Sequence, residues 1–172
     1  TQREVPNKVT VISSKTSKLQ QPQTTADLLA LSGEVFIQKS QYGGGSPMIR
    51  GFATNRLLIT VDGVRMNTAI FRSGNVQNII SVDAFATERT EVLFGPGSVN
   101  YGSDAIAGVM SFYTLTPKLS LNDNPLVTGS ATARYSSAAN EMTGHFNVGV
   151  GWKKFAMLTS FTYSDFGDLR MG

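Results

Sequence analysis

The stretch MIRGFATNRLLITVDGVRMN, residues 48–67, is followed after a polar segment by TEVLFGPGSVNYGSDAIAGVMSFYT, residues 90–114. Each block joins glycine-rich turns to short apolar runs, which predicts strands at 57–61, 88–94 and 109–115. Asp62-Gly63 predicts a type I′ hairpin turn after the first of these strands. Short strands without a regular βαβ rhythm indicate a small α+β domain.

The residues before these blocks extend this domain. Residues 9–12 predict a strand, and 13–23 form a polar stretch. A helix is expected to begin at Thr24 or Thr25, either of which can cap it, and to end near Gly33. Its apolar face would be formed by Leu28, Leu29 and Leu31. A second strand is expected at 35–38, and the glycine-rich residues 41–47 are expected to form a loop.

Composition excludes several classes of protein. Only 16% of residues are charged, whereas about 25% is usual for soluble domains. No apolar run approaches the roughly 20 residues of a membrane-spanning helix, so strands would have to do any spanning. The chain has no Cys, and its 15 basic and 12 acidic residues are dispersed. This pattern argues against a thiolate metal site and a nucleic-acid footprint. The dispersed carboxylates and single His likewise give no support for catalysis or a metal site.

The last third of the sequence alternates strictly between apolar and polar residues. Alternating runs cover 127–136, 145–152 and 155–164, and Lys153-Lys154 predicts a tight turn. Such alternation is typical of membrane β-barrel strands, although soluble meanders also show it. Aromatic residues at strand ends, including Trp152 and Tyr163, favour the membrane interpretation. His145 would then face the lumen as a solvated side chain.

The two blocks resemble the plug domain of TonB-dependent outer-membrane receptors, and the resemblance covers residues 9–116. Residues 48–52 match the family's IRG motif, and 88–96 match its second block. The resemblance implies an α+β plug domain with a small mixed β-sheet at 1–117. Residues 118–172 would then be the first antiparallel strands of a transmembrane β-barrel, truncated after about three. Three strands cannot close a barrel, so the rest of the wall is expected beyond Gly172.

The family motifs suggest contacts between plug and barrel. In the family the arginine of IRG, here Arg50, pairs with barrel glutamates; the alternative is pairing within the plug. A second arginine normally precedes Gly-Pro, but this chain has Phe94 there. The ionic contact between plug and barrel could then rest on one arginine instead of two. Arg89 or Arg72 could supply the second arginine, or an apolar contact could replace it.

A second charged group contributes candidate contacts with the barrel. It comprises Glu88, Arg89 and Glu91. Local pairing along the strand is the alternative interpretation.

The glycines at 95–97 and 102 are expected to form tight turns, since the segment lacks a phosphate-loop lysine.

Three apical loops of the family meet the ligand, and by motif position they are residues 41–46, 53–56 and 67–74. Their candidate ligand-binding residues are Tyr42, Asn55, Arg56, Phe71 and Arg72. Arginine forks suit carboxylates and aromatic rings stack on flat ligands, so a ferric siderophore or haem is expected as transported ligand. The plug itself would hold no cofactor.

The resemblance implies energised uptake across the bacterial outer membrane. The expected partners are TonB, the chain's own barrel, outer-membrane lipid and a small-molecule ligand, with no role as an enzyme. Residues 1–5 do not match a TonB box, which is expected just before Thr1. Alternatives are uptake of an oligosaccharide or cobalamin, or a free-standing β-rich binding module. The sequence VDGVRMN at 61–67 is more similar to the iron-chelate and haem branch than to the oligosaccharide branch, which usually has DGVP.

Overall fold

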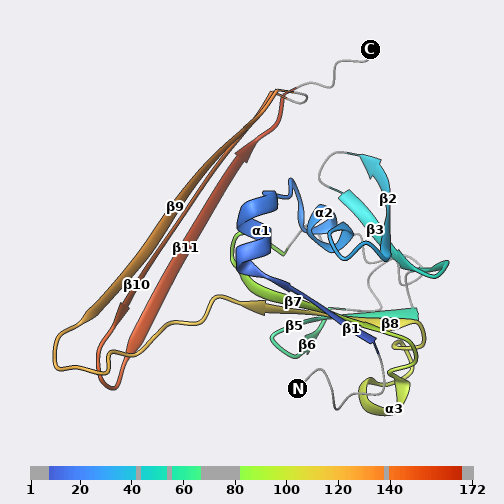
Figure 1. Cartoon of the computed structure of the whole chain (residues 1–172), viewed down its shortest axis with the longest axis horizontal. Helices are drawn as coiled ribbons and strands as arrows, with labels where there is room; N and C mark the ends of the chain where they lie inside the picture. Colours follow the sequence, from blue (N-terminus) through green and yellow to red (C-terminus); the bar gives the residue numbers. More distant parts are fainter. Residues whose placement is uncertain (1–7, 42–43, 54–55, 67–81, 138–139, 168–172) are drawn as a thin grey trace. The chain divides into compact units, whose positions relative to one another are not determined.

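A computed structural model of the chain describes residues 8–41, 44–53, 56–66, 82–137 and 140–167 (Figure 1). The chain divides into two compact units, Thr1–Thr114 and Leu115–Gly172. Within the described part of the chain, no helix is long and apolar enough to cross a membrane.

The first unit is built on a five-stranded sheet in the order β1-β7-β8-β5-β6. Its strands are β1 (Lys8–Ser13), β5 (Leu57–Val61), β6 (Val64–Arg65), β7 (Thr87–Phe94) and β8 (Gly108–Thr114). β5 pairs with β8 in parallel and all other neighbours are antiparallel. The predicted mixed sheet of a small α+β domain is therefore confirmed.

The core of this unit lies between the sheet and the segments that cover it. Phe112, Met110 and Val92 are fully buried in it, and Ile49 and Leu29 join them from outside the sheet. Strand β5 is buried along four of its five residues, which explains its nearly continuous apolar sequence. Burial of such side chains, at about 1.5–3 kcal/mol each, is the main stabilising term of the unit.

Two helices pack near the sheet. Helix α2 (Thr25–Ala30) begins where predicted: Thr24 is its N-cap, and the Thr24 hydroxyl accepts a hydrogen bond from the Asp27 backbone N–H. Leu28 and Leu29 are buried as expected, but Leu31 at the C-cap is exposed.

The polar stretch also contains a helix that the sequence did not predict. Helix α1 (Ser14–Gln20) is capped by Ser13 and ends at Gln21, which has a left-handed backbone. Its residue Leu19 is exposed, so the helix has no apolar stripe that a periodicity argument could detect.

The predicted loop at 41–47 is partly wrong. Strand β3 (Gly44–Ile49) pairs with β2 (Val35–Gln41) and with the short β4 (Phe52–Ala53). Glycine makes this pairing possible: a Cβ added to Gly45 would lie 2.5 Å from the Ile37 Cγ2 atom. Pro47 has no backbone N–H to donate to a neighbouring strand. It is tolerated because β4 pairs with Met48 and Ile49 of β3 and not with Pro47.

Turns in the first unit follow the sequence closely. Asp62 and Gly63 have φ angles of +48° and +82°, as the predicted type I′ turn requires. After β7, Gly95 and Gly102 also have positive φ, and a short helix α3 (Ser98–Tyr101) lies between them. The predicted glycine turns are therefore confirmed.

The second unit is a three-stranded antiparallel sheet in the order β11-β10-β9. Its strands are β9 (Leu126–Ser136), β10 (Glu141–Gly151) and β11 (Ala156–Asp165). They overlap the three alternating runs of the sequence, but β10 begins at 141, four residues before its predicted run at 145. Phe146 lies opposite both Ala131 and Phe161, so the predicted apolar faces of all three strands coincide.

Candidate functional site

Most of the predicted ligand-binding residues lie outside the described residues. These are Tyr42, Asn55, Phe71 and Arg72. Arg56 is described: its backbone oxygen accepts a hydrogen bond from the Ala107 N–H at 2.9 Å, while its side chain is exposed. Its guanidinium carbon lies 5.5 Å from the centroid of the Phe52 ring. This places a cation–π pair, a suitable surface for an anionic aromatic ligand, beside the start of β5.

Arg50 occupies a tight turn between β3 and β4. It has a φ of +50° and is followed by Gly51 at +81°. A left-handed backbone costs a non-glycine residue about 1–2 kcal/mol, so the turn holds Arg50 in a strained conformation. Its side chain is exposed, and no described carboxylate forms an ion pair with it.

The predicted charged group on β7 separates into two parts. Arg89 forms an ion pair with Glu91, with 3.2 Å between Nε and Oε1. The Arg89 guanidinium also stacks 4.1 Å from the centroid of the Tyr113 ring, whose hydroxyl donates to Glu91 at 3.2 Å. Glu88 is exposed and does not share this cluster, because it stands at the bulge between Thr87 and Arg89 in the β7–β8 pairing. Arg89 and Glu91 thus pair along the strand in this structure.

Phe94, which stands where the family has an arginine, lies in the hydrophobic core. Only 3% of it is exposed, and it packs in the same cluster as Phe112 and Val92. Lys8, opposite Phe94 in the sheet, places its ammonium 6.0 Å from the centroid of the Phe94 ring. The side chain at this position therefore makes apolar contacts within the first unit.

A polar clamp at the end of β8 was not predicted. Asp62 accepts hydrogen bonds from the Thr114 backbone N–H at 2.9 Å and from the Thr114 hydroxyl at 2.6 Å. The Asp62 N–H donates in turn to the Phe112 carbonyl. The sequence suggested only a turn at Asp62, since its partner is 52 residues away. The clamp ties the β5–β6 hairpin to the last residue of the first unit.

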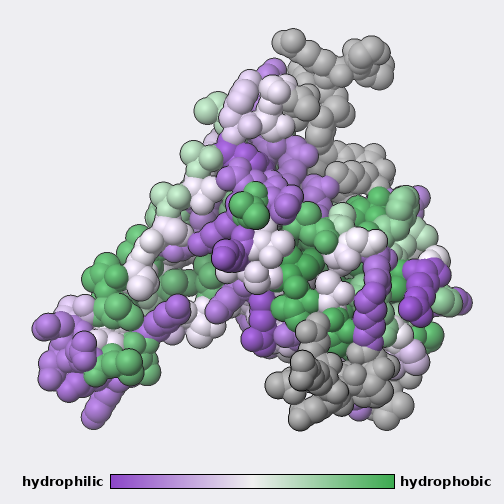
Figure 2. Space-filling model, in the orientation of Figure 1, coloured by the Kyte–Doolittle hydropathy of each residue, from purple (hydrophilic) through white to green (hydrophobic). Residues whose placement is uncertain are grey.

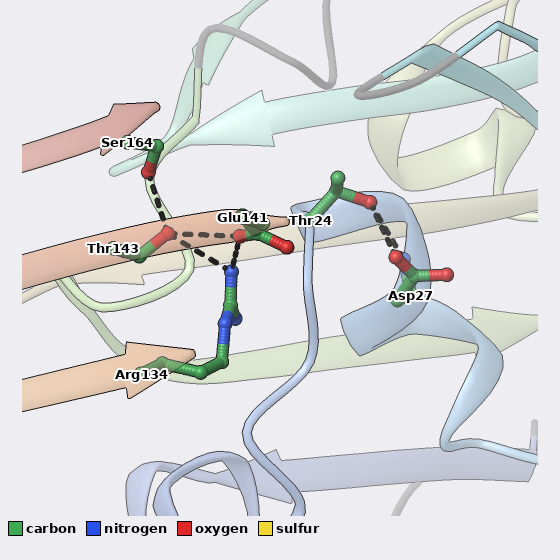
Figure 3. A network of polar contacts seen from close by, with 6 residues as sticks. All are labelled: Thr24, Asp27, Arg134, Glu141, Thr143 and Ser164. Atoms are coloured by element: carbon green, nitrogen blue, oxygen red, sulfur yellow. Dashed lines mark hydrogen bonds and ion pairs between the residues drawn. The ribbon is translucent and has the colours of Figure 1, made fainter. Parts of the chain in front are cut away.

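The second unit has a polar network on one face of its sheet. Arg134 and Glu141 form a buried ion pair, with 8% and 0% of their side chains exposed. The Thr143 hydroxyl lies 2.8 Å from Glu141 and 3.0 Å from the Ser164 hydroxyl. Figure 3 shows these side chains converging from the three neighbouring strands β9, β10 and β11.

His145 continues the polar face further along β10. Its Nδ1 lies 2.6 Å from the Thr162 hydroxyl and its Nε2 lies 3.2 Å from the Asn147 amide, which also donates to Ser130. The predicted side of the sheet is correct, but the expectation of a solvated histidine is wrong. His145 is only 5% exposed, and its ring is hydrogen-bonded to Thr162 on the neighbouring strand β11 and to Asn147 on its own strand.

The opposite face of this sheet carries exposed apolar and aromatic side chains. Phe146 and Phe161 pack with ring centroids 5.7 Å apart. The other large exposed members are Val127, Tyr135, Met142, Val148, Met157 and Tyr163. Figure 2 shows green side chains along these strands. Water is an unfavourable neighbour for so continuous an apolar surface, which indicates a lipid or protein contact.

The sequence matches the family described as TonB-dependent Receptor Plug Domain over residues 1–109. The chain belongs to this family. It is 41% identical to the vitamin B12 transporter BtuB of Vibrio vulnificus over 68% of the chain and 19% of that protein. It is 30% identical to the hemin receptor of Yersinia pestis over 97% of the chain and 24% of that protein.

Solved structures agree with this family. The siderophore receptor PirA from Acinetobacter baumannii superposes with a TM-score of 0.68 and 25% identity, covering 92% of this chain and 24% of PirA. The chain therefore spans about a quarter or less of the length of these relatives. Since the family consists of outer-membrane receptors, this plug belongs to a receptor of the outer membrane.

Proposed function

We propose that this chain forms the gate and the first wall strands of a pore for energised uptake of a ferric siderophore or haem. Residues 1–117 would be the plug and 118–172 the start of the barrel. The plug would bind no resident cofactor and perform no catalysis. The observation that carries the proposal is the sidedness of the β9–β11 sheet, which joins an exposed apolar face to a polar face in a chain of the plug family.

The dimensions of this sheet support a membrane location. Strand β10 has 11 residues, which at about 3.3 Å per residue gives about 36 Å along the strand. Tilted by about 40°, as barrel strands are, it would span roughly 28 Å, close to the ~25 Å apolar band of such barrels. Both outer strands of the sheet have an unpaired edge in the described structure, where further wall strands would pair.

The topology of the plug suggests how force would act on it. TonB would pair by strand addition with a segment just before Thr1 and pull it toward the cell interior. Among the described residues β1 is an edge strand that pairs with β7 alone, so a pull from the N-terminus loads one ladder of hydrogen bonds first. The remaining four strands of the sheet need not be disrupted by that first step.

The apical loops would contact the ligand through cationic and aromatic side chains. Arg56 with Phe52 is the described part of this surface. Tyr42, Asn55, Phe71 and Arg72 are proposed to complete it. Relatives named for hemin and siderophores support this ligand class. Cobalamin is the second candidate, because identity to the BtuB transporter reaches 41%.

Plug and barrel would be joined through exposed charges. Arg50 is the foremost candidate, since it is exposed in the turn between β3 and β4. The exposed Glu88 could also contact the wall. Arg89 and Glu91 are already paired with each other, so we propose that they contribute as a pair.

The full receptor gene, expressed in cells that lack haem, siderophore and cobalamin receptors, tests these proposals. Growth on haem or a ferric siderophore that disappears when TonB is deleted is the expected result. Growth restored by cobalamin alone selects the second candidate. A gene product that stays in aqueous extracts would instead favour a free-standing binding module.

Changing both Phe71 and Arg72 to Ala should weaken ligand binding without lowering the amount of folded receptor.

A further inference from the structure

The turn between β10 and β11 sets two lysines between two aromatic side chains. The rings of Trp152 and Phe155 stack with centroids 5.9 Å apart and planes inclined by 29°. The Trp152 N–H donates to the Phe155 carbonyl at 2.7 Å, which closes the turn. Lys153 and Lys154, at its tip, are exposed. The turn is therefore a compact unit with a stacked aromatic base and a cationic tip.

The segment before β9 lies against this turn. The Ser120 N–H donates to the Trp152 carbonyl at 3.2 Å. Lys153 also forms an ion pair with Asp123. These contacts hold residues 118–125 and 152–155 together, and we refer to these two segments as the basic end of the sheet.

Charge is concentrated at the basic end. Lys118 belongs to it, because the Lys118 carbonyl oxygen lies so close to Gly151 that an added Cβ there would clash with it. Three lysines, at 118, 153 and 154, against the single acid Asp123 give a formal net charge of +2. Asp123 is 92% exposed and Lys153 is 55% exposed, so their ion pair remains accessible to a competing anion.

The opposite end of the sheet differs in charge. Residues 137–140, which connect β9 to β10, have the uncharged sequence Ser-Ala-Ala-Asn. Arg134 and Glu141, next to this connection, neutralise each other in their buried ion pair. A sheet with an apolar outer face and one basic end matches the layered chemistry of a membrane, whose acyl chains are bounded by phosphate headgroups.

We propose that the basic end binds the headgroups of anionic phospholipids. Lys153 and Lys154 donate to phosphate oxygens, while the Trp152 ring, with Phe155 stacked on it, lies at the boundary with the acyl chains, where Trp and Tyr are favoured. The proposal assigns this turn to the periplasmic side of the outer membrane, where short turns lie and which faces phospholipid and not lipopolysaccharide. This inference rests on the proposed function, because it requires the sheet to lie in a membrane.

Asp123 allows the lipid affinity of the basic end to be changed in both directions. Its carboxylate competes with lipid phosphate for Lys153, whereas no described ion pair involves Lys154. Removing the Asp123 charge should strengthen lipid binding, and removing the lysine charges should weaken it. Each lysine near an anionic membrane surface contributes roughly fivefold in affinity.

Native mass spectrometry of the full receptor can measure this effect. The receptor is released from membranes of phosphatidylethanolamine and phosphatidylglycerol, and its retained lipids are counted. We expect Lys153→Gln with Lys154→Gln to lower the retained ratio of phosphatidylglycerol to phosphatidylethanolamine about five- to twentyfold. Asp123→Asn should raise it. Lys15→Gln with Lys18→Gln, which removes two exposed charges from α1, is the matched control and should leave the ratio unchanged.

The outcomes separate this inference from the proposed function. An unchanged lipid ratio in the Lys153/Lys154 variant of a membrane-embedded receptor overturns the inference alone. So does an equal loss in the α1 control, since it would indicate a non-specific charge effect. A receptor that does not enter the membrane overturns both proposals. Lys154→Gln alone, which keeps the Lys153–Asp123 ion pair, provides the test if the double variant does not fold.

Discussion

The Asp62 clamp permits a graded test of how the first unit ends. Asp62 has a φ of +48° and accepts two hydrogen bonds from Thr114. Since the site is exposed, each hydrogen bond contributes about 0.5–1 kcal/mol. A left-handed alanine adds about 1 kcal/mol of backbone strain. Asp62→Ala should therefore cost about 2–3 kcal/mol, which combines both effects.

Two further substitutions at the same position separate the two effects. Asp62→Gly removes the hydrogen bonds but tolerates the backbone conformation, so it should cost about 1–2 kcal/mol. Asp62→Asn keeps one accepting oxygen and the favoured Asn-Gly turn, so it should cost under about 1 kcal/mol. The expected order of destabilisation is Asn, then Gly, then Ala.

Hydrogen exchange in the full receptor measures these differences at the end of β8. The peptide covering 108–114 should exchange about 30- to 150-fold faster in Asp62→Ala, since about 1.4 kcal/mol corresponds to a factor of ten. Peptides from β10 serve as the internal control and should be unchanged. Equal exchange in the Ala, Gly and wild-type receptors would refute the argument that the clamp holds Thr114.

Three other substitutions test the packing, each by thermal unfolding of the purified receptor. Gly108→Ala should cost about 2–3 kcal/mol, because the new Cβ would lie 2.6 Å from the Leu93 carbonyl oxygen. Gly144→Ala is the control and should be neutral, because the space around Gly144 is open. Equal destabilisation by the two substitutions would contradict the close packing at Gly108. Phe94→Arg should destabilise the receptor by about 3 kcal/mol or more because it buries a charge, whereas Phe94→Leu should be tolerated. A stable Phe94→Arg receptor would indicate that the arginine side chain reaches the barrel wall. Glu141→Gln should cost about 3–5 kcal/mol, because it removes the carboxylate that pairs with the buried Arg134 guanidinium. The double variant Arg134→Gln/Glu141→Gln should recover part of the loss. Full stability of the single variant would argue that this ion pair does not stabilise the sheet.

Local sequence signals predicted the elements whose stabilisation is local. Asp62-Gly63 specified its turn because both positions need a positive φ, and Thr24 specified the start of α2 because its hydroxyl satisfies a free backbone N–H. Strict alternation located β9, β10 and β11, since a period of two sorts side chains onto the faces of a sheet. Helix α1 was missed because its sequence is polar and has no periodic apolar pattern. The Ser13 cap alone is too weak a signal to predict a helix.

The candidate site was less predictable than the fold. Motif positions named Arg50, Arg56, Glu88, Arg89 and Glu91, but only the structure separates Glu88 from the pair formed by Arg89 and Glu91. The environment of Phe94 was open to several interpretations from sequence, and its burial in the core settles the contacts that it makes in the first unit. The four remaining ligand-loop residues stay predictions.

The sequence by itself determined the family, the mixed character of the first sheet and the two faces of the second. The family and the mixed sheet were implied by the resemblance of the two glycine-rich blocks to known plug motifs, and the two faces follow from a period of two within a few residues. Only the tertiary structure decided which distant groups meet: Asp62 with Thr114, Gly45 with Ile37, and His145 with Thr162. Such contacts depend on strand register and on the close approach of backbones, which chain neighbours do not encode.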